Sequence, residues 1–292
     1  MNLQEVPVAK VVTPPKIEYE KEGLQFFEGV VYKTWQGVDC RMDIVCPGGT
    51  DRAYPAVVWV HGGGWSDENL TRKYLPSREL ADLAKRGYVT ASIDYRLCQT
   101  ARFPAQIEDC KAAVRFLRAN AARYQIDPDH IAAWGESAGG HLVELMAYSD
   151  DTEFMDGTNP EYSSRLQGVI PWYAPIDLRR EASAKKEGGP EEDSPFVRLF
   201  AYEDEEERQR MMEAASPILY ADRKNPPTLL MHGDADRLVS YSASVEMEHA
   251  LQAAGNDVEL VTVPGQGHGF FDGEEYYQRI YAFLERVLAF SV

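Results

Sequence analysis

A single serine stands between glycines in the stretch Gly-Glu-Ser-Ala-Gly, residues 135–139. An apolar run precedes it and a helix-like run follows, which is the context in which G-x-S-x-G presents a nucleophilic hydroxyl. A strand that enters a helix through one tight turn strains the central residue, and side chains two positions away on either side would collide. Because the motif also occurs by chance in turns of small residues, Ser137 requires a base and an acid before it can act.

His268 is the histidine best placed to serve as the base, because it lies among three glycines directly after the last apolar run. The other histidines are expected to be exposed, to pack locally or to be buried with satisfied hydrogen bonds. The acid should follow an earlier strand, in the chain order serine, acid, histidine. Asp236 is the preferred acid, since the preceding strand ends at Gly233, and Asp234 is the alternative, although it is more typical of a turn.

A developing negative oxygen would require hydrogen-bond donors, and three glycines in His-Gly-Gly-Gly-Trp, residues 61–65, follow a buried apolar run. Without side chains, Gly63 and Gly64 can present backbone N–H groups to that oxygen, together with the N–H of Ala138. A phosphate-binding loop is the weaker interpretation, because neither G-K-[ST] nor G-x-G-x-x-G spacing is present. His61 is expected to anchor the loop.

Strand-like and helix-like segments alternate along the chain and predict an α/β fold, with a mostly parallel, doubly wound sheet and helices on both faces. The expected strands are 26–35, 40–49, 55–60, 88–95, 131–135, 166–174, 227–233 and 258–263. The expected helices are 78–87, 107–124, 138–148, 242–255 and 274–290. The serine, the acid, the histidine and the glycine loop each follow an expected strand, and ligands bind at that end of an open α/β sheet.

The expected organisation is an N-terminal extension, 1–24, followed by one catalytic domain, 25–292. Residues 178–215 are charged and then amphipathic, and they are far longer than an ordinary connection between strands. Two interpretations are open for them: a solvated helical excursion on the surface, or a small cap or lid over the end of the sheet where ligands bind.

The formal net charge of −17 disfavours nucleic acid and anionic membrane surfaces as partners. No apolar run reaches the roughly 18 residues of a membrane span, and the first 16 residues lack the uninterrupted apolar core of a secretory signal. A cytoplasmic protein is therefore expected, and a secreted form whose signal has been removed is the alternative. The four cysteines show no CxxC spacing and are expected to be buried thiols, with a Cys98–Cys110 bridge as the alternative.

Several motifs together resemble the α/β-hydrolase superfamily, and more narrowly the esterases related to hormone-sensitive lipase and the acetyl- and feruloyl-esterases that act on plant polysaccharides. They are HGGGW (61–65), DYRL (94–97), GESAGGHL (135–142), WYAPIDL (172–178) and GQGHGF (265–270). The resemblance implies an eight-stranded sheet whose second strand is antiparallel, and no cofactor or metal. It also implies a catalytic triad and an oxyanion hole, formed by Ser137, Asp236 and His268 and by Gly63, Gly64 and Ala138, respectively.

The substrate expected from the resemblance is a small-molecule or oligosaccharide ester. The chain lacks the APE that usually follows DYRL in relatives of hormone-sensitive lipase, whereas HGGGW and WYAPIDL favour the carbohydrate-ester branch. Trp65, Trp172 and Tyr173 are expected near the site, where their rings can stack on a sugar or ferulate ring. Ordinary aromatic packing is an equally good interpretation of Trp172 and Tyr173.

The sequence therefore predicts a serine carboxylesterase that cleaves short acyl esters, with acetyl groups on xylan-type oligosaccharides as the expected substrate. A feruloyl esterase and a general carboxylesterase of the hormone-sensitive-lipase type are alternatives. Two further hypotheses are an amide hydrolase of the peptidase or arylformamidase type and a non-catalytic binding protein. The complete set of serine, acid and histidine disfavours the binding protein.

Overall fold

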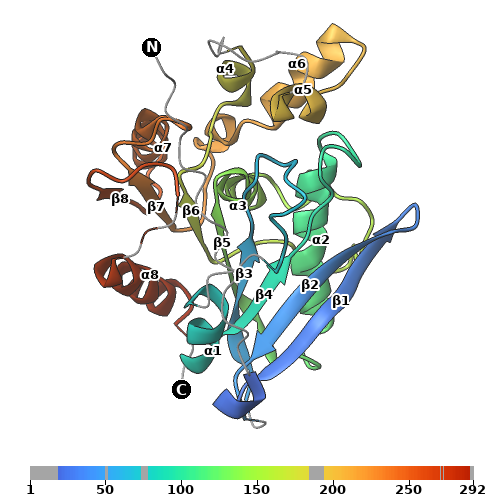
Figure 1. Ribbon diagram of the computed structural model, residues 1–292, viewed down its shortest axis with the longest axis vertical. Coiled ribbons are helices and arrows are strands. Elements are labelled where there is room, and N and C mark those ends of the chain that lie inside the picture. The colour runs from blue at the N-terminus through green and yellow to red at the C-terminus, as the bar shows by residue number, and fades with distance from the viewer. Residues whose placement is uncertain are drawn as a thin grey trace.

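Eight strands form one sheet in the part of the chain that the computed structural model describes, which is residues 19–49, 52–73, 78–183, 194–269, 271 and 273–289 (Figure 1). They are β1 (Gln25–Trp35), β2 (Val38–Cys46), β3 (Tyr54–Val60), β4 (Val89–Ile93), β5 (Ile126–Glu136), β6 (Gly168–Trp172), β7 (Thr228–Gly233) and β8 (Val258–Val263). Their order in the sheet is β1-β2-β4-β3-β5-β6-β7-β8. Only the β1–β2 and β2–β4 pairs are antiparallel, which confirms the mostly parallel sheet and the antiparallel second strand.

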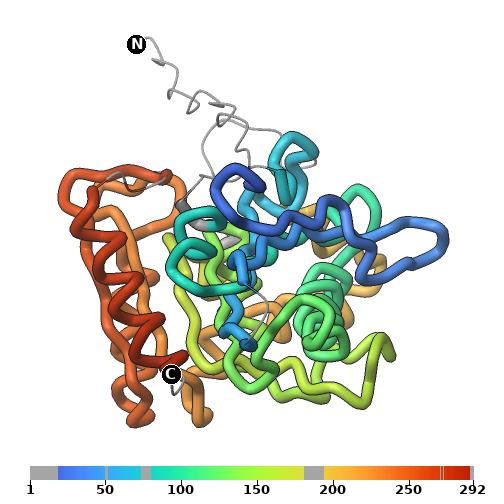
Figure 2. The backbone as a smooth tube through the Cα atoms, turned by 90° about the horizontal axis from the view of Figure 1, so that it is seen from below, coloured from blue at the N-terminus to red at the C-terminus, as the bar shows by residue number. Residues whose placement is uncertain are grey.

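Helices cover both faces of the sheet. Successive residues of a strand point to opposite faces, so a continuous apolar strand makes both faces apolar, and both must be covered. In β3, Val58 and Val60 pack toward α2 (Ala105–Ala119), α3 (Ala138–Tyr148) and α7 (Tyr241–Ala253), whereas Val57 and Trp59 pack toward α1 (Leu83–Lys85) and α8 (Glu274–Val287). Figure 2 shows α8 at the edge of the molecule opposite the β1–β2 hairpin. Two apolar cores, one on each face, therefore hold the sheet.

Two helices differ most from their expected extents. The segment 78–87 contains one π-helical turn, η2 (Arg78–Asp82), before the three residues of α1, and Gly87 ends it with φ 92°. The helix expected over 107–124 begins earlier, after Pro104, and ends at Ala119. At that end the backbone amide and the side-chain amide of Asn120 both donate to the carbonyl oxygen of Phe116, at 3.0 and 2.9 Å.

The long segment between β6 and β7 forms α4 (Leu178–Ser183), α5 (Pro195–Leu199), α6 (Glu205–Ala214) and a 3₁₀ turn, η4 (Pro217–Tyr220), with residues 184–193 outside the described part. These helices lie together at the top of the molecule in Figure 1. N-cap side chains cap two of them: Ser194 accepts the amide of Val197, and Asp204 accepts that of Glu207. We call this segment the insertion.

The expected N-terminal extension lies mostly outside the described residues. Its described end forms a 3₁₀ turn, η1 (Tyr19–Glu22), and Leu24 packs against Val45 and against η2. All four cysteines are buried free thiols, so the structure contains no Cys98–Cys110 bridge. No described helix is both long and apolar enough to cross a membrane.

Candidate active site

Ser137 occupies the sharp turn between β5 and α3. Its backbone is strained, with φ 50° and ψ −117°, and such conformations cost a residue with a side chain about 1–3 kcal/mol. A Cβ on Gly135 would lie 2.6 Å from the carbonyl oxygen of Gly139, and a Cβ on Gly139 would lie 2.0 Å from that of Val60. The two glycines are therefore a steric requirement of the turn, which leaves the serine partly exposed.

The structure brings Ser137, His268 and Asp236 together from three separate loops. The Nε2 atom of His268 lies 3.0 Å from Oγ of Ser137, and its Nδ1 atom lies 2.7 Å from Oδ2 of Asp236. With a proton on Nδ1, the lone pair of Nε2 faces the serine hydroxyl and can accept its proton. The alternative acid, Asp234, is exposed and accepts the amide of Gly265 at 2.6 Å, so it supports a turn and does not contact His268.

The carboxyl group of Asp236 is fully buried and held on both oxygens. Its Oδ1 accepts the amides of Leu238 and Val239, and its Oδ2 contacts imidazole nitrogens of His268 and His232. Burial by itself raises the pKa of this carboxyl, but the hydrogen bonds from His232 and His268 outweigh it and hold the pKa well below its ordinary value. Asp236 is therefore ionised at neutral pH and can stabilise a positive charge on His268.

His232 is a neighbour of the site that the sequence presented only as a buried imidazole. It has no exposed surface, its Nδ1 atom lies 2.7 Å from Oγ of Ser244, and its Nε2 atom lies 3.1 Å from Oδ2 of Asp236. Its position four residues before Asp236, at the end of a buried strand, was the available signal. It contacts the same carboxyl oxygen, Oδ2 of Asp236, that faces His268, and so helps to fix that oxygen.

The glycine loop after β3 offers backbone donors near the serine. Gly63 and Gly64 have φ values of 96° and 57°, which glycine adopts without strain, and the amides of Ser66 and Asp67 both donate to the carbonyl oxygen of Gly63. Among the hydrogen bonds of the described residues, none uses the amide of Gly63, Gly64 or Ala138 as donor. The amide of Ala138, at the first position of α3, has no acceptor within the helix.

His61 and Tyr95 anchor this loop through ring stacking and hydrogen bonds. The two rings stack with centroids 4.4 Å apart, and the hydroxyl of Tyr95 donates to the carbonyl oxygens of His61 and Gly62 at 3.0 and 3.1 Å. Burial lowers the pKa of His61, which favours its neutral form. His61 thus has the anchoring contacts that its position in the sequence predicted.

The three aromatic residues expected to bind substrate lie at or beneath the site, but they are buried. Trp65 is 3% exposed, Trp172 is 0% exposed and Tyr173 is 1% exposed. Trp172 packs among core aromatic rings, including Trp59 and Trp134, at centroid distances of 6.1 and 5.0 Å. The packing interpretation therefore describes Trp172 and Tyr173, and in this structure Trp65 too offers no open ring face for a sugar.

The insertion contacts the glycine loop directly. The Phe196 ring lies edge-on to the Trp65 ring, with centroids 5.4 Å apart, and a Cβ on Gly64 would lie 3.5 Å from Cγ of Pro195. His141 links the glycine loop to the insertion, because its Nδ1 accepts the indole N–H of Trp65 at 3.3 Å and its Nε2 lies 2.7 Å from the carbonyl oxygen of Ala215. The insertion is thus part of the wall around the glycine loop.

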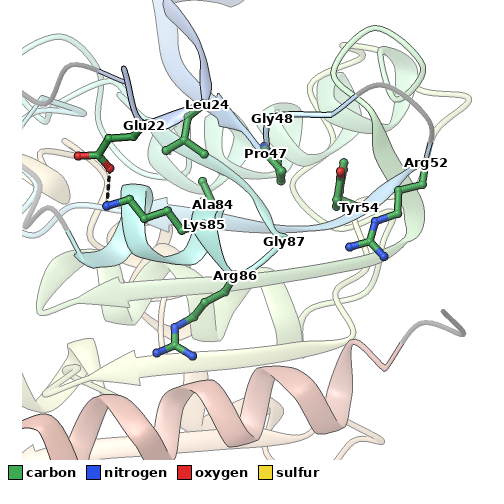
Figure 3. A pocket seen from close by; sticks show the side chains of 11 residues that line it. Glu22, Leu24, Pro47, Gly48, Arg52, Tyr54, Ala84, Lys85, Arg86 and Gly87 are labelled. Atoms are coloured by element: carbon green, nitrogen blue, oxygen red, sulfur yellow. Dashed lines mark ion pairs between the residues drawn. The ribbon is translucent and has the colours of Figure 1, made fainter. Parts of the chain in front are cut away.

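A pocket of about 350 Å³ lies at the opposite end of the sheet, where β2 ends and β3 and β4 begin (Figure 3). Arg52, Lys85 and Arg86 line it, and Lys85 forms an ion pair with Glu22. None of its lining residues belongs to the serine site. Among the described residues, no three His, Cys, Asp or Glu side chains gather as a metal site.

Comparisons with known proteins find esterases among the proteins similar to this chain. The sequence matches the BD-FAE family over residues 42–251. Esterase LipQ of Mycobacterium tuberculosis is 29% identical over 75% of this chain and 51% of LipQ, and this chain spans about half the length of the curated relatives it matches. A truncated carbohydrate esterase from gut microbiota superposes with a TM-score of 0.77 at 28% identity, over 91% of this chain and 97% of that one. Esterase 2 of Thermogutta terrifontis with bound propionate superposes with a TM-score of 0.72 at 27% identity, over 94% and 96%.

Proposed function

Because the chain belongs to the BD-FAE family and has an α/β-hydrolase fold, we propose that it is a serine carboxylesterase in which Ser137, His268 and Asp236 are the catalytic triad. The observation that carries the proposal is the unbroken hydrogen-bonded series from the strained serine through His268 to the buried carboxylate, at 3.0 and 2.7 Å. Such a series serves to make a neutral hydroxyl nucleophilic.

In the proposed reaction Oγ of Ser137 attacks the ester carbonyl carbon while Nε2 of His268 takes the hydroxyl proton. The carbonyl oxygen becomes negative and accepts hydrogen bonds from the amides of Gly63, Gly64 and Ala138, the oxyanion hole of this proposal. His268 then returns its proton to the leaving alcohol. While His268 carries that proton it is an imidazolium, which the ionised Asp236 stabilises. Water then attacks the acyl-enzyme by the same route and releases the acid.

We propose short acyl groups as the substrate class, and acetyl esters of xylan-type oligosaccharides within it. Two similar proteins support this: one is named a carbohydrate esterase, and the other was solved with propionate, a three-carbon acid. The partly exposed Ser137, Gly63 and Gly64 leave an approach for a bulky alcohol group. Because Trp65, Trp172 and Tyr173 are buried, a sugar would be held by other groups around this approach.

The test is acetate release from acetylated xylo-oligosaccharides, with p-nitrophenyl acetate measured in parallel and Ser137→Ala as the control. We expect both activities in the wild-type protein and a loss of about 10⁴-fold or more in kcat in the variant, because the nucleophile is removed. Hydrolysis of p-nitrophenyl acetate alone would keep the serine mechanism but refute the carbohydrate assignment. Equal activity of wild type and Ser137→Ala would refute the mechanism.

A further inference from the structure

The side chain of Glu136, the residue before the serine, lies inside the site and has two specific partners. It is 5% exposed. Its Oε1 atom accepts the amide of Gly62 at 3.3 Å, and its Oε2 atom accepts the hydroxyl of Tyr173 at 2.6 Å. Gly62 directly precedes Gly63 in the glycine loop, so one carboxyl oxygen holds the segment that carries the proposed oxyanion donors.

The second partner of Glu136 leads to the base. The ring of Tyr173 lies edge-on to the imidazole of His268, with centroids 4.5 Å apart and an interplanar angle of 63°. The backbone of Tyr173 has φ 36°, a conformation that persists only where surrounding contacts hold it. Its amide donates to the carbonyl oxygen of Met231 at 2.9 Å, and its hydroxyl is fixed by Glu136. The Tyr173 ring is thus held at both ends where it contacts His268.

Burial of a carboxyl group is costly unless hydrogen bonds satisfy its oxygens. Burial raises the pKa of Glu136, while the hydrogen bonds from Tyr173 and Gly62 and the nearby His268 act in the opposite direction. Glu144, eight residues along the chain in α3, is a useful contrast. It is also buried, but among the described residues neither of its oxygens has a hydrogen-bond partner. The two contacts of Glu136 are therefore a specific feature of the site.

We propose that Glu136 is a positioning residue that couples the oxyanion donors to the base. One oxygen fixes Gly62, and through it the orientation of the next amide in the loop, while the other fixes Tyr173 against His268. The inference rests on the proposed esterase function, since it concerns the groups that stabilise the transition state. A small displacement of such groups lowers the rate strongly, because their effect depends on being in place before charge develops.

The experiment compares four variants with the wild type. Glu136→Ala removes both contacts, and Tyr173→Phe removes only the one toward the base. Glu136→Gln retains a carbonyl oxygen for the Gly62 amide and an NH₂ group that can donate to the Tyr173 hydroxyl oxygen. Glu144→Gln is the matched control, a buried glutamate without these contacts. The measurements are kcat and KM for p-nitrophenyl acetate and the inhibition constant of an alkyl trifluoromethyl ketone, whose serine adduct places an oxyanion in the hole.

We expect Glu136→Ala to lower kcat by about tenfold or more with KM within about threefold, since loosening a donor should cost less than the 10²–10³-fold of deleting one. The inhibition constant should rise by a similar factor. Glu136→Gln should restore kcat to within about threefold of wild type, Tyr173→Phe should lose about threefold or more, and Glu144→Gln should match wild type. A purely structural role would change thermal stability and leave kcat and the inhibition constant unchanged.

Unchanged kcat and inhibition constant in Glu136→Ala, beside an active wild type, would refute this inference alone. Equal impairment of Glu136→Ala and Glu136→Gln would also refute it, because the charge and not the positioning contacts would then matter. If Glu136→Ala does not fold, an unchanged kcat in Tyr173→Phe refutes the coupling to the base. A wild type inactive toward p-nitrophenyl acetate and acetylated xylo-oligosaccharides refutes the proposed function and this inference with it.

Discussion

Protonation of His141 is expected to destabilise the fold in mild acid. Its imidazole is completely buried, accepts the indole N–H of Trp65 at Nδ1 and donates from Nε2 to the carbonyl oxygen of Ala215, which is the arrangement of a neutral ring. A second proton would have to be placed on Nδ1, opposite the indole N–H. Burial lowers the pKa of His141 to about 4, and the hydrogen bond to Ala215 opposes this only in part.

The sign and size of the effect follow from linkage. The pKa is about 4 in the folded protein and 6.5 for the reference histidine, so between these values the unfolded chain binds a proton that the folded protein does not. Stability therefore falls as the pH decreases from 6.5 toward 4. The expected loss relative to pH 7 is about 2 kcal/mol at pH 5 and about 3 kcal/mol at pH 4.

The assay is urea unfolding of the wild type and of His141→Gln at several pH values between 7 and 4.5. Glutamine can retain the donor to Ala215 but does not titrate, so the variant should lack this part of the acid destabilisation. The wild-type free energy of unfolding should fall relative to that of the variant by about 2 kcal/mol between pH 7 and pH 5. Parallel pH profiles for the two proteins would refute the assignment of a depressed pKa to this buried ring.

Two other substitutions test the packing of the serine turn and of α3, the helix that follows it. Gly139→Ala should reduce kcat by more than about tenfold and destabilise the fold by about 1–3 kcal/mol or more. The reason is that its Cβ would lie 2.0 and 2.5 Å from the carbonyl oxygens of Val60 and His61. A variant with the kcat and melting temperature of the wild type would contradict this. Glu144→Leu should stabilise the protein by about 1–3 kcal/mol at pH 8, because a buried carboxyl without a partner is removed. Burial raises the folded pKa of Glu144 well above 4.5, so the wild-type protein loses stability as the pH rises above that value. Urea unfolding should therefore show that the stability advantage of Glu144→Leu over the wild type grows from pH 4.5 to pH 8. An advantage that stays constant over this range would count against a buried, partnerless carboxyl group.

The local patterns of the sequence determined the elements of the fold. Continuous apolar runs such as 55–60 became strands buried on both faces, and the glycines around Ser137 became the turn that they predicted. These signals are reliable because they arise from constraints within a few residues: side-chain periodicity, the φ range open to glycine, and the space inside a tight turn. The chain order of strands and helices then placed Ser137, Asp236 and His268 at the same edge of the sheet.

Only the tertiary structure decided which side chains meet at that edge and how they are held. Asp234 and Asp236 differ by two positions, and the sequence could rank them only by turn propensity, whereas their contacts assign one to Gly265 and the other to His268. The sequence likewise assigned no partner to Glu136. The physical reason is that hydrogen bonding and burial depend on segments far apart in the chain, since 131 positions separate Ser137 from His268. The residue types set what chemistry is available, and the packing of distant segments decides which groups can carry it out.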